Sequence, residues 1–102
     1  RGTKMTCWSA AQYGHLVTLQ WARANGCLWD KDTCEYATAD GHLEILQWLR
    51  ANGCEWDEET CGGAVEGEHR DMFVWALENG SPISGETLEY AGKLGWPVDV
   101  WD

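Results

Sequence analysis

Positively charged residues are scarce in this chain. Its 102 residues include 7 Lys and Arg against 17 Asp and Glu, which gives a formal net charge of -10. Binding to nucleic acids and to anionic membranes depends largely on cations that neutralise phosphate groups. Neither is therefore an expected partner.

Long apolar runs are also missing. No stretch approaches the roughly 18 consecutive apolar residues of a membrane-spanning helix, and the N-terminal residues lack the pattern of a secretory signal peptide. A chain of 102 residues has room for one small domain but not for a multidomain enzyme. We therefore expect a single domain that is not exported.

The chain is dominated by an internal repeat of 27 residues. This step separates Trp21, Trp48 and Trp75; His15, His42 and His69; Asn25, Asn52 and Asn79; and Ala10, Ala37, Ala64 and Ala91. The units run approximately over 3–29, 30–56, 57–83 and 84–102, about three and a half copies in one repeat domain. Because both ends fall inside a unit, we expect a fragment of a longer array.

Each unit is predicted to form two short helices. N-capping residues open the first helix at Thr3, Asp30, Asp57 and Ser84. In the second unit we expect helices over 31–40 and 42–51, the first ending at Gly41 and the second at Asn52-Gly53. The second helix has a broad apolar face with Leu46 and Leu49, whereas the first has a stripe of small residues.

One segment resembles a known family. Gly41-His42-Leu43-Glu44-Ile45-Leu46-Gln47-Trp48-Leu49, followed by Gly53-Cys54, is similar to the second helix of ankyrin repeats. The unit is shorter than the ankyrin unit of about 33 residues, so we expect the projecting β-hairpin fingers to be missing. The resemblance implies an all-α solenoid of stacked antiparallel helix pairs, because one pair cannot bury its apolar face alone.

The resemblance also implies structural roles for the histidines and tryptophans. A histidine at the start of the second helix binds loop backbone in ankyrin-like units, and Trp21, Trp48 and Trp75 occupy the place of a core leucine. Trp29 and Trp56 are expected to pack between units. The chain has no nucleophile motif, no H-E-x-x-H and no glycine-rich phosphate loop, so we expect no enzymatic activity.

The five cysteines follow the repeat in two series. Cys7, Cys34 and Cys61 share one position, and Cys27 and Cys54 share another, where the third unit has Ser81. An odd count without a secretory signal favours free thiols in a reducing, cytoplasmic compartment. Equivalent cysteines should lie about 8 to 10 Å apart, too far for a disulfide or a shared zinc ion. The alternative is a metal-binding or redox element built on the pairs Cys27/Cys34 and Cys54/Cys61, which flank the turns between units.

One row on the first helices changes between units while the stripe beside it does not. In stacked units such a row forms a continuous face, and exposed aromatic residues are frequent in binding hot spots. This first-helix row gives the candidate partner-binding residues, namely Trp8, Ser9, Gln12, Glu35, Tyr36, Ala39, Gly62, Gly63, Glu66, Glu89 and Tyr90.

We therefore expect a non-enzymatic protein–protein interaction module that binds a protein or peptide on the first-helix row, with no cofactor or metal. Acidic residues such as Asp30, Asp32, Asp57, Glu58 and Glu59 could attract a basic partner, although N-capping also explains most of them. Alternatives are a merely solvated face, a structural spacer in a larger protein, and end-to-end self-association through uncapped terminal units.

The third unit departs from the pattern. It has Gly62-Gly63 where the second unit has Glu35-Tyr36, and Glu68 replaces the terminating Gly41. We expect its first helix to be weak and to end about one residue early. The glycines either leave space for a neighbouring side chain or partner backbone, or mark a decaying copy. The segment 90–99 also matches 21–30 in a shifted register, which leaves the structure of the tail open.

Overall fold

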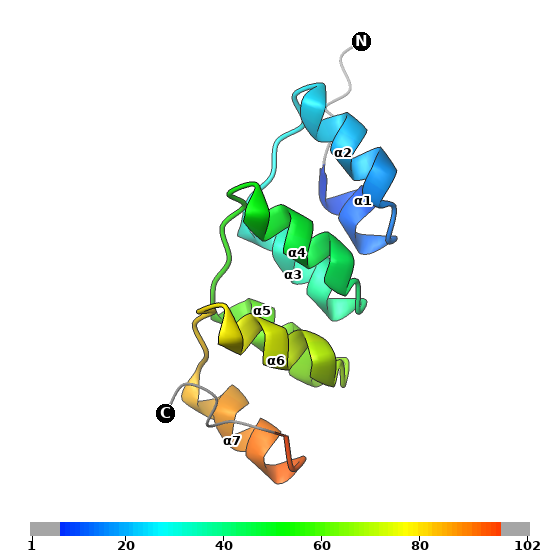
Figure 1. Cartoon of the computed structure of the whole chain (residues 1–102). Helices are drawn as coiled ribbons and strands as arrows, with labels where there is room; N and C mark the ends of the chain where they lie inside the picture. Colours follow the sequence, from blue (N-terminus) through cyan, green and yellow to red (C-terminus); the bar gives the residue numbers. More distant parts are fainter. Residues whose placement is uncertain (1–6, 97–102) are drawn as a thin grey trace.

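The computed structural model describes residues 7–96, and in this range the protein is all-helical (Figure 1). Its helices are α1 (Cys7–Gln12), α2 (Leu16–Ala24), α3 (Lys31–Ala39), α4 (Leu43–Ala51), α5 (Glu58–Glu66), α6 (Arg70–Glu78) and α7 (Gly85–Lys93). Among these residues, every helix is too short or too polar to cross a lipid bilayer.

The helices form pairs that follow one another along the long axis of the molecule. Figure 1 shows α1 with α2, α3 with α4 and α5 with α6, and α7 at the far end. The first helices of successive units contact each other, α1 with α3, α3 with α5 and α5 with α7. The result is an elongated body of 48 × 21 × 19 Å.

Side-chain caps set the starts of the first helices. The Asp30 carboxylate accepts a hydrogen bond from the Asp32 amide at 3.0 Å, Asp57 does the same for Glu59, and the Ser84 hydroxyl accepts from Thr87. These three predicted caps are confirmed, whereas Thr3 lies outside the described residues. The boundaries differ by one residue from the prediction, because Asp40 and His42 flank the helices rather than belonging to them.

Small residues on the first helices and large ones on the second helices make the core. Cys34, Ala37 and Thr38 of α3 are buried, as are Leu46 and Leu49 of α4. Small side chains allow α3 to lie close to both α1 and α5. The core therefore runs through successive units rather than being confined to one.

The periodic tryptophans are less buried than predicted. Trp48 and Trp75 are half-buried, and Trp21 is 60% exposed, so its assignment to the core is wrong. Trp48 contacts Trp29 edge-on at 5.5 Å between ring centroids, and Trp75 contacts Trp56 at 5.9 Å. These rings pack between units at the edge of the core, not in its centre.

The tryptophans of the turns are placed as predicted, between units. The Arg23 guanidinium lies 3.9 Å above the ring of Trp29, and Arg50 lies 4.2 Å above Trp56. Each turn tryptophan therefore contacts an arginine of its own unit and a tryptophan of the next unit. Gly2 stands in the register of Trp29, so the sequence supplies no such aromatic partner for Trp21.

Histidines join neighbouring units. Nε2 of His42 donates a hydrogen bond to the Gln12 carbonyl at 2.8 Å, and Nε2 of His69 donates to the Ala39 carbonyl at 3.1 Å. Each acceptor is the last residue of the preceding first helix. The predicted bond to backbone is confirmed, and it connects one unit with the next.

The third unit keeps the helix length of the second, so the predicted early end of its first helix is wrong. Helix α5 ends at Glu66, in the same register as Ala39 of α3. The His69 amide donates to the Ala64 carbonyl at 2.8 Å and closes the turn as His42 does. Glu68 adopts the left-handed conformation itself, with φ of 59°.

We expect Glu68→Gly to stabilise the protein by about 1 kcal/mol, because a left-handed backbone is costly for a residue with a Cβ atom. Urea unfolding measures the change. Glu89→Gly is the control, since Glu89 is exposed within α7 and glycine there should destabilise by about 1 kcal/mol. The same sign for both variants would contradict the strain assigned to Glu68.

The in-register alignment of the fourth unit holds for its described residues. Leu94 is the C-cap of α7, and the next residue, Gly95, has φ of 80°. Trp96 occupies the register that holds histidine in the other units. The Trp96 ring packs against Phe73 at 5.3 Å between centroids. Residues 97–102, the rest of the tail, lie outside the described residues, so the structure does not test the shifted register there.

Candidate binding surface

The first-helix row lies along α1, α3, α5 and α7. Trp8 is 40% exposed, Tyr36 38% and Tyr90 48%, although tyrosine and tryptophan are more often partly buried. The rings of Trp8 and Tyr36 come from adjacent units and contact each other at 5.0 Å between centroids. The structure therefore brings two of the predicted aromatic residues together on the surface.

The other members of the row differ in exposure. Ala39, Glu66 and Glu89 are exposed, whereas Gln12 and Glu35 are half-buried. The Ser9 side chain lies outside what the structure describes. The row is thus exposed at its aromatic residues and at Ala39, Glu66 and Glu89, and partly covered at Gln12 and Glu35.

The glycine pair interrupts the row. A Cβ atom on Gly63 would lie 3.6 Å from the Ala39 amide nitrogen, and one on Gly62 would lie 3.7 Å from the Thr87 hydroxyl. These are ordinary contact distances, so both positions face neighbouring units. Beside them is a hollow lined by Gly62, Val65, Glu66, Glu86, Thr87 and Tyr90. Of the two glycines only Gly62 lines this hollow, on the side of α7.

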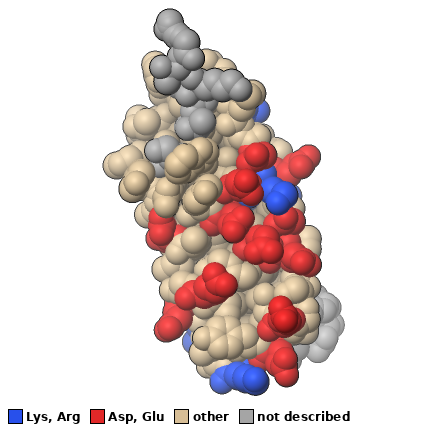
Figure 2. Space-filling model, turned by 180° about the vertical axis from the view of Figure 1, so that it is seen from behind, with Lys and Arg blue, Asp and Glu red and all other residues tan. Residues whose placement is uncertain are grey.

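Carboxylates surround this face. Figure 2, which views the molecule from the side of α1, α3, α5 and α7, shows Asp and Glu spread over most of its length with few Lys or Arg. The acidic side chains on α3, α5 and α7 are Asp32, Glu35, Glu58, Glu59, Glu66, Glu86 and Glu89, against Lys31 and Lys93. The face has a strongly negative potential.

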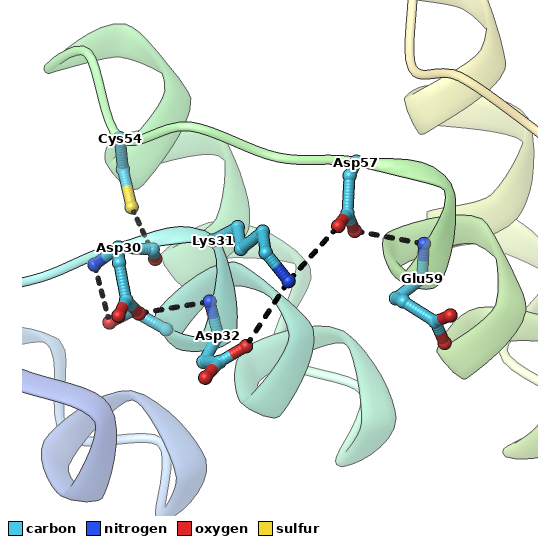
Figure 3. A network of polar contacts seen from close by, with 7 residues as sticks. Asp30, Lys31, Asp32, Cys54, Asp57 and Glu59 are labelled. Carbon is cyan, nitrogen blue, oxygen red and sulfur yellow. Dashed lines mark hydrogen bonds and ion pairs between the residues drawn. The ribbon is translucent and has the colours of Figure 1, made fainter.

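Lys31 forms ion pairs with neighbouring carboxylates. Its Nζ lies 3.2 Å from Oδ2 of Asp57 and 3.8 Å from Oδ1 of Asp32 (Figure 3). The hydrogen bond from Lys31 to Asp57 and the charge of that carboxylate raise the pKa of Lys31. Asp57 also caps α5, so Lys31 connects α3 to the start of the next unit. The remaining carboxylates have little cationic compensation.

The pKa of Glu35 is affected by these neighbouring carboxylates. Its pKa is raised, first by burial and then by the charges of Glu59, Asp32 and Asp57, with Lys31 acting in the opposite direction. The ionised form of Glu35 is therefore unfavourable in the folded protein. A cation bound near it would lower this pKa.

We expect Glu35→Gln to stabilise the protein at neutral pH. Because the folded pKa lies above the unfolded one, ionised Glu35 costs stability at high pH and the cost disappears as pH falls below the unfolded value. Urea unfolding at about pH 7 and about pH 4 should show a gain only at the higher pH. Glu44→Gln, at an exposed position on α4, is the control. An equal gain at both values would contradict this origin.

The cysteines pair within units rather than across the turns. Cys7 and Cys27 form a disulfide, whereas Cys34 and Cys54 are buried free thiols that shift each other's pKa. The Cys61 thiol donates to the Ser81 hydroxyl at 3.4 Å. The pairs Cys27/Cys34 and Cys54/Cys61 proposed from sequence are therefore wrong, as is the free thiol expected at Cys7 and Cys27. Residues 7–96 contain no group of three or more His, Cys, Asp or Glu placed to hold a metal ion.

Sequence reasoning missed an exposed apolar stripe on the first unit. Tyr13, Val17, Trp21 and Leu28 are all exposed. The second unit has Asp40, Glu44 and Glu55 in the registers of Tyr13, Val17 and Leu28. A register-by-register comparison of the first two units contains this signal, because the second unit is acidic at all three positions.

No protein-family model matches the chain, and a search of curated proteins finds no match either. The functional argument therefore rests on the surface itself.

Proposed function

We propose that the chain is a non-enzymatic protein-binding module, an ankyrin-like solenoid of stacked helix pairs whose first-helix row binds a basic segment of another protein. The observation that carries this proposal is the exposed contact between Trp8 and Tyr36 beside the carboxylates of α3 and α5. Aromatic side chains at the surface supply binding energy, and the carboxylates select for cations.

The repeated contacts support the solenoid interpretation. Each histidine bond joins adjacent units, and the first helices touch in sequence order from α1 to α7. The connection from α2 to α3 spans only 25–30, and the one from α4 to α5 only 52–57, which leaves no room for hairpin fingers. The helices themselves therefore provide the binding surface in this proposal.

Arginine fits this surface better than other side chains. A guanidinium group stacks on Trp or Tyr rings and donates paired hydrogen bonds to carboxylates. The exposed Tyr36 and Trp8 rings lie in the same row as Glu35, whose charge is compensated only in part, by Lys31. An extended Arg- or Lys-rich segment could contact the rings and carboxylates of several units at once.

The test measures binding of a fluorescein-labelled arginine-rich peptide, with a glutamate-rich peptide of equal length as comparison. Fluorescence anisotropy should detect binding of the basic peptide only, and the affinity should fall at high salt. Tyr36→Ala should weaken binding about tenfold, as expected for a hot-spot aromatic.

Trp21→Ala is the matched control because Trp21 is an exposed aromatic on α2, outside the first-helix row. It should bind the basic peptide as the parent chain does. Unchanged binding by both Trp21→Ala and Tyr36→Ala would assign binding to general charge attraction, and an equal loss for both would contradict a site on the first-helix row. Failure of both peptides to bind would leave the spacer or solvated-face interpretation.

A further inference from the structure

Two side chains meet at the same place in each of the first three units. One belongs to the first helix, at Cys7, Cys34 and Cys61, and the other follows the Asn-Gly turn, at Cys27, Cys54 and Ser81. Cys7 and Cys27 are bonded, with 5.8 Å between their Cα atoms. Cys34 and Cys54 are free thiols near enough to shift each other's pKa, and Cys61 donates to the Ser81 hydroxyl. All six side chains are buried.

The backbone holds the second member of each pair in the same way. The amides of Cys27, Cys54 and Ser81 donate to the carbonyls of Ala22, Leu49 and Ala76 at 3.0, 3.0 and 2.9 Å. The glycine before each has φ of 94°, 87° and 88°. Arg23 and Arg50 further hold the carbonyls of Cys27 and Cys54. Cys54 is therefore held by the backbone as Cys27 is, and it stands to Cys34 in the register in which Cys27 is bonded to Cys7.

We propose that Cys34 and Cys54 form a second disulfide site, oxidised by exchange with a low-molecular-weight disulfide such as oxidised glutathione. The first and second units are then each crosslinked between first helix and following turn. The third unit is not crosslinked, because the Ser81 hydroxyl cannot form a disulfide with Cys61.

The exchange balances with one molecule of oxidised glutathione. The Cys54 thiolate attacks one glutathione sulfur, forms a mixed disulfide and displaces the other glutathione, which takes up the proton that Cys54 lost. The Cys34 thiolate then attacks the sulfur of Cys54, and the second glutathione leaves with the proton from Cys34. Two protein thiols and one glutathione disulfide become one protein disulfide and two glutathione thiols.

The surroundings favour Cys54 as the first nucleophile. Cys34 lowers the pKa of Cys54, burial and the charge of Asp30 act in the opposite direction, and the charges of Arg50 and Arg23 add smaller lowering contributions. The interaction with Cys54 and burial raise the pKa of Cys34. In the reduced protein the Cys54 thiol also donates to the Asp30 carbonyl at 3.3 Å (Figure 3). Losing that donor is tolerated because the Thr33 amide donates to the same carbonyl at 3.0 Å. Both sulfurs are buried, so exchange requires local opening of the unit.

The test is disulfide mapping of the full chain after equilibration with excess oxidised glutathione. The sample is quenched with acid and alkylated, and it is digested with trypsin and a glutamate-specific protease to separate Cys54 from Cys61. Before alkylation, the intact chain should weigh about 4 Da less than the fully reduced chain, because two disulfides form with the loss of four hydrogens. Cys61 should be the alkylated cysteine, and Tm should rise by about 10 °C over a chain with only the Cys7–Cys27 link.

Two variants make the assignment specific. Cys54→Ser reproduces the Cys61/Ser81 pair in the second unit and should abolish the second link. Ser81→Cys should create a third link to Cys61 and a total loss of about 6 Da. Alkylation of both Cys34 and Cys54 in chains that contain the Cys7–Cys27 bond would overturn the proposal. A link from Cys54 to Cys61, or a Cys61 that stays free in Ser81→Cys, would overturn it as well. The mapping of the parent chain decides the matter even if Cys54→Ser fails to fold.

Discussion

Replacing Phe73 by alanine is expected to destabilise the protein by about 3 to 5 kcal/mol, the usual cost of removing a buried aromatic side chain. Phe73 is fully buried in α6, and its ring contacts Trp96 beyond the end of α7. The substitution therefore empties the core of the third unit and removes the contact that the fourth unit makes with it. Urea unfolding followed by circular dichroism measures the change in free energy. Thermal unfolding should show a fall in Tm of roughly 15 °C or more.

Trp21→Ala is the control for this loss. Trp21 is also an aromatic residue of a second helix, but it is exposed, so its removal should cost less than about 1 kcal/mol. The contrast separates burial from aromatic character. Similar losses for Phe73→Ala and Trp21→Ala would show that the core does not run through α6 as described.

Gly41→Ala is expected to destabilise the protein by about 2 to 3 kcal/mol, for two reasons that add. Gly41 has φ of 80°, a conformation that costs about 1 kcal/mol or more for alanine. The new Cβ atom would also lie 2.7 Å from Cε1 of His69, which must move and give up its hydrogen bond to the Ala39 carbonyl. Equilibrium unfolding in urea measures the sum.

Two further variants separate the reasons. Gly53 has φ of 87°, and no neighbouring atom lies within 4 Å of the place that an alanine Cβ would take, so Gly53→Ala should cost only the backbone strain, about 1 kcal/mol. In a His69→Ala background the extra cost of Gly41→Ala should disappear, because the ring it would strike is gone. A full cost that persists in that background would contradict the close approach of His69.

The local structure could be predicted from the sequence because its causes are local. An aspartate or serine followed by acidic residues caps a helix wherever it occurs, and a glycine can end one without strain. The caps at Asp30, Asp57 and Ser84 were therefore predictable, as was the left-handed Gly41. Glu68 was mispredicted because the turn is closed by the His69 amide, which holds even a non-glycine residue in the left-handed conformation.

Burial and pairing depend on neighbours in space, which periodicity does not reveal. Trp21 and Trp48 share a register, yet only Trp48 has a tryptophan from the preceding turn beside it. The predicted cysteine pairs are wrong because they follow closeness in sequence, seven residues from Cys27 to Cys34, whereas the geometry of a helical hairpin decides which cysteines meet. That geometry brings residues 20 apart together, as in Cys7 and Cys27.

The candidate surface was predictable in position but not in detail. Comparison of copies correctly placed Trp8, Tyr36 and Tyr90 at the surface. The contact between Trp8 and Tyr36 depends on the distance between α1 and α3, which no single unit encodes. The pKa of Glu35 is likewise raised by burial and by carboxylates of two units.

The histidine bond between units has a consequence for how such a chain can change its length. Each unit offers a backbone carbonyl at the end of its first helix, and the next unit needs only a carbonyl, not a particular side chain. Removing 31–57 in register would place Glu58 directly after the Asp30 cap and present the Gln12 carbonyl to His69. Recombination between misaligned copies of the coding sequence would thus shorten or lengthen the array by whole units while leaving every junction chemically complete.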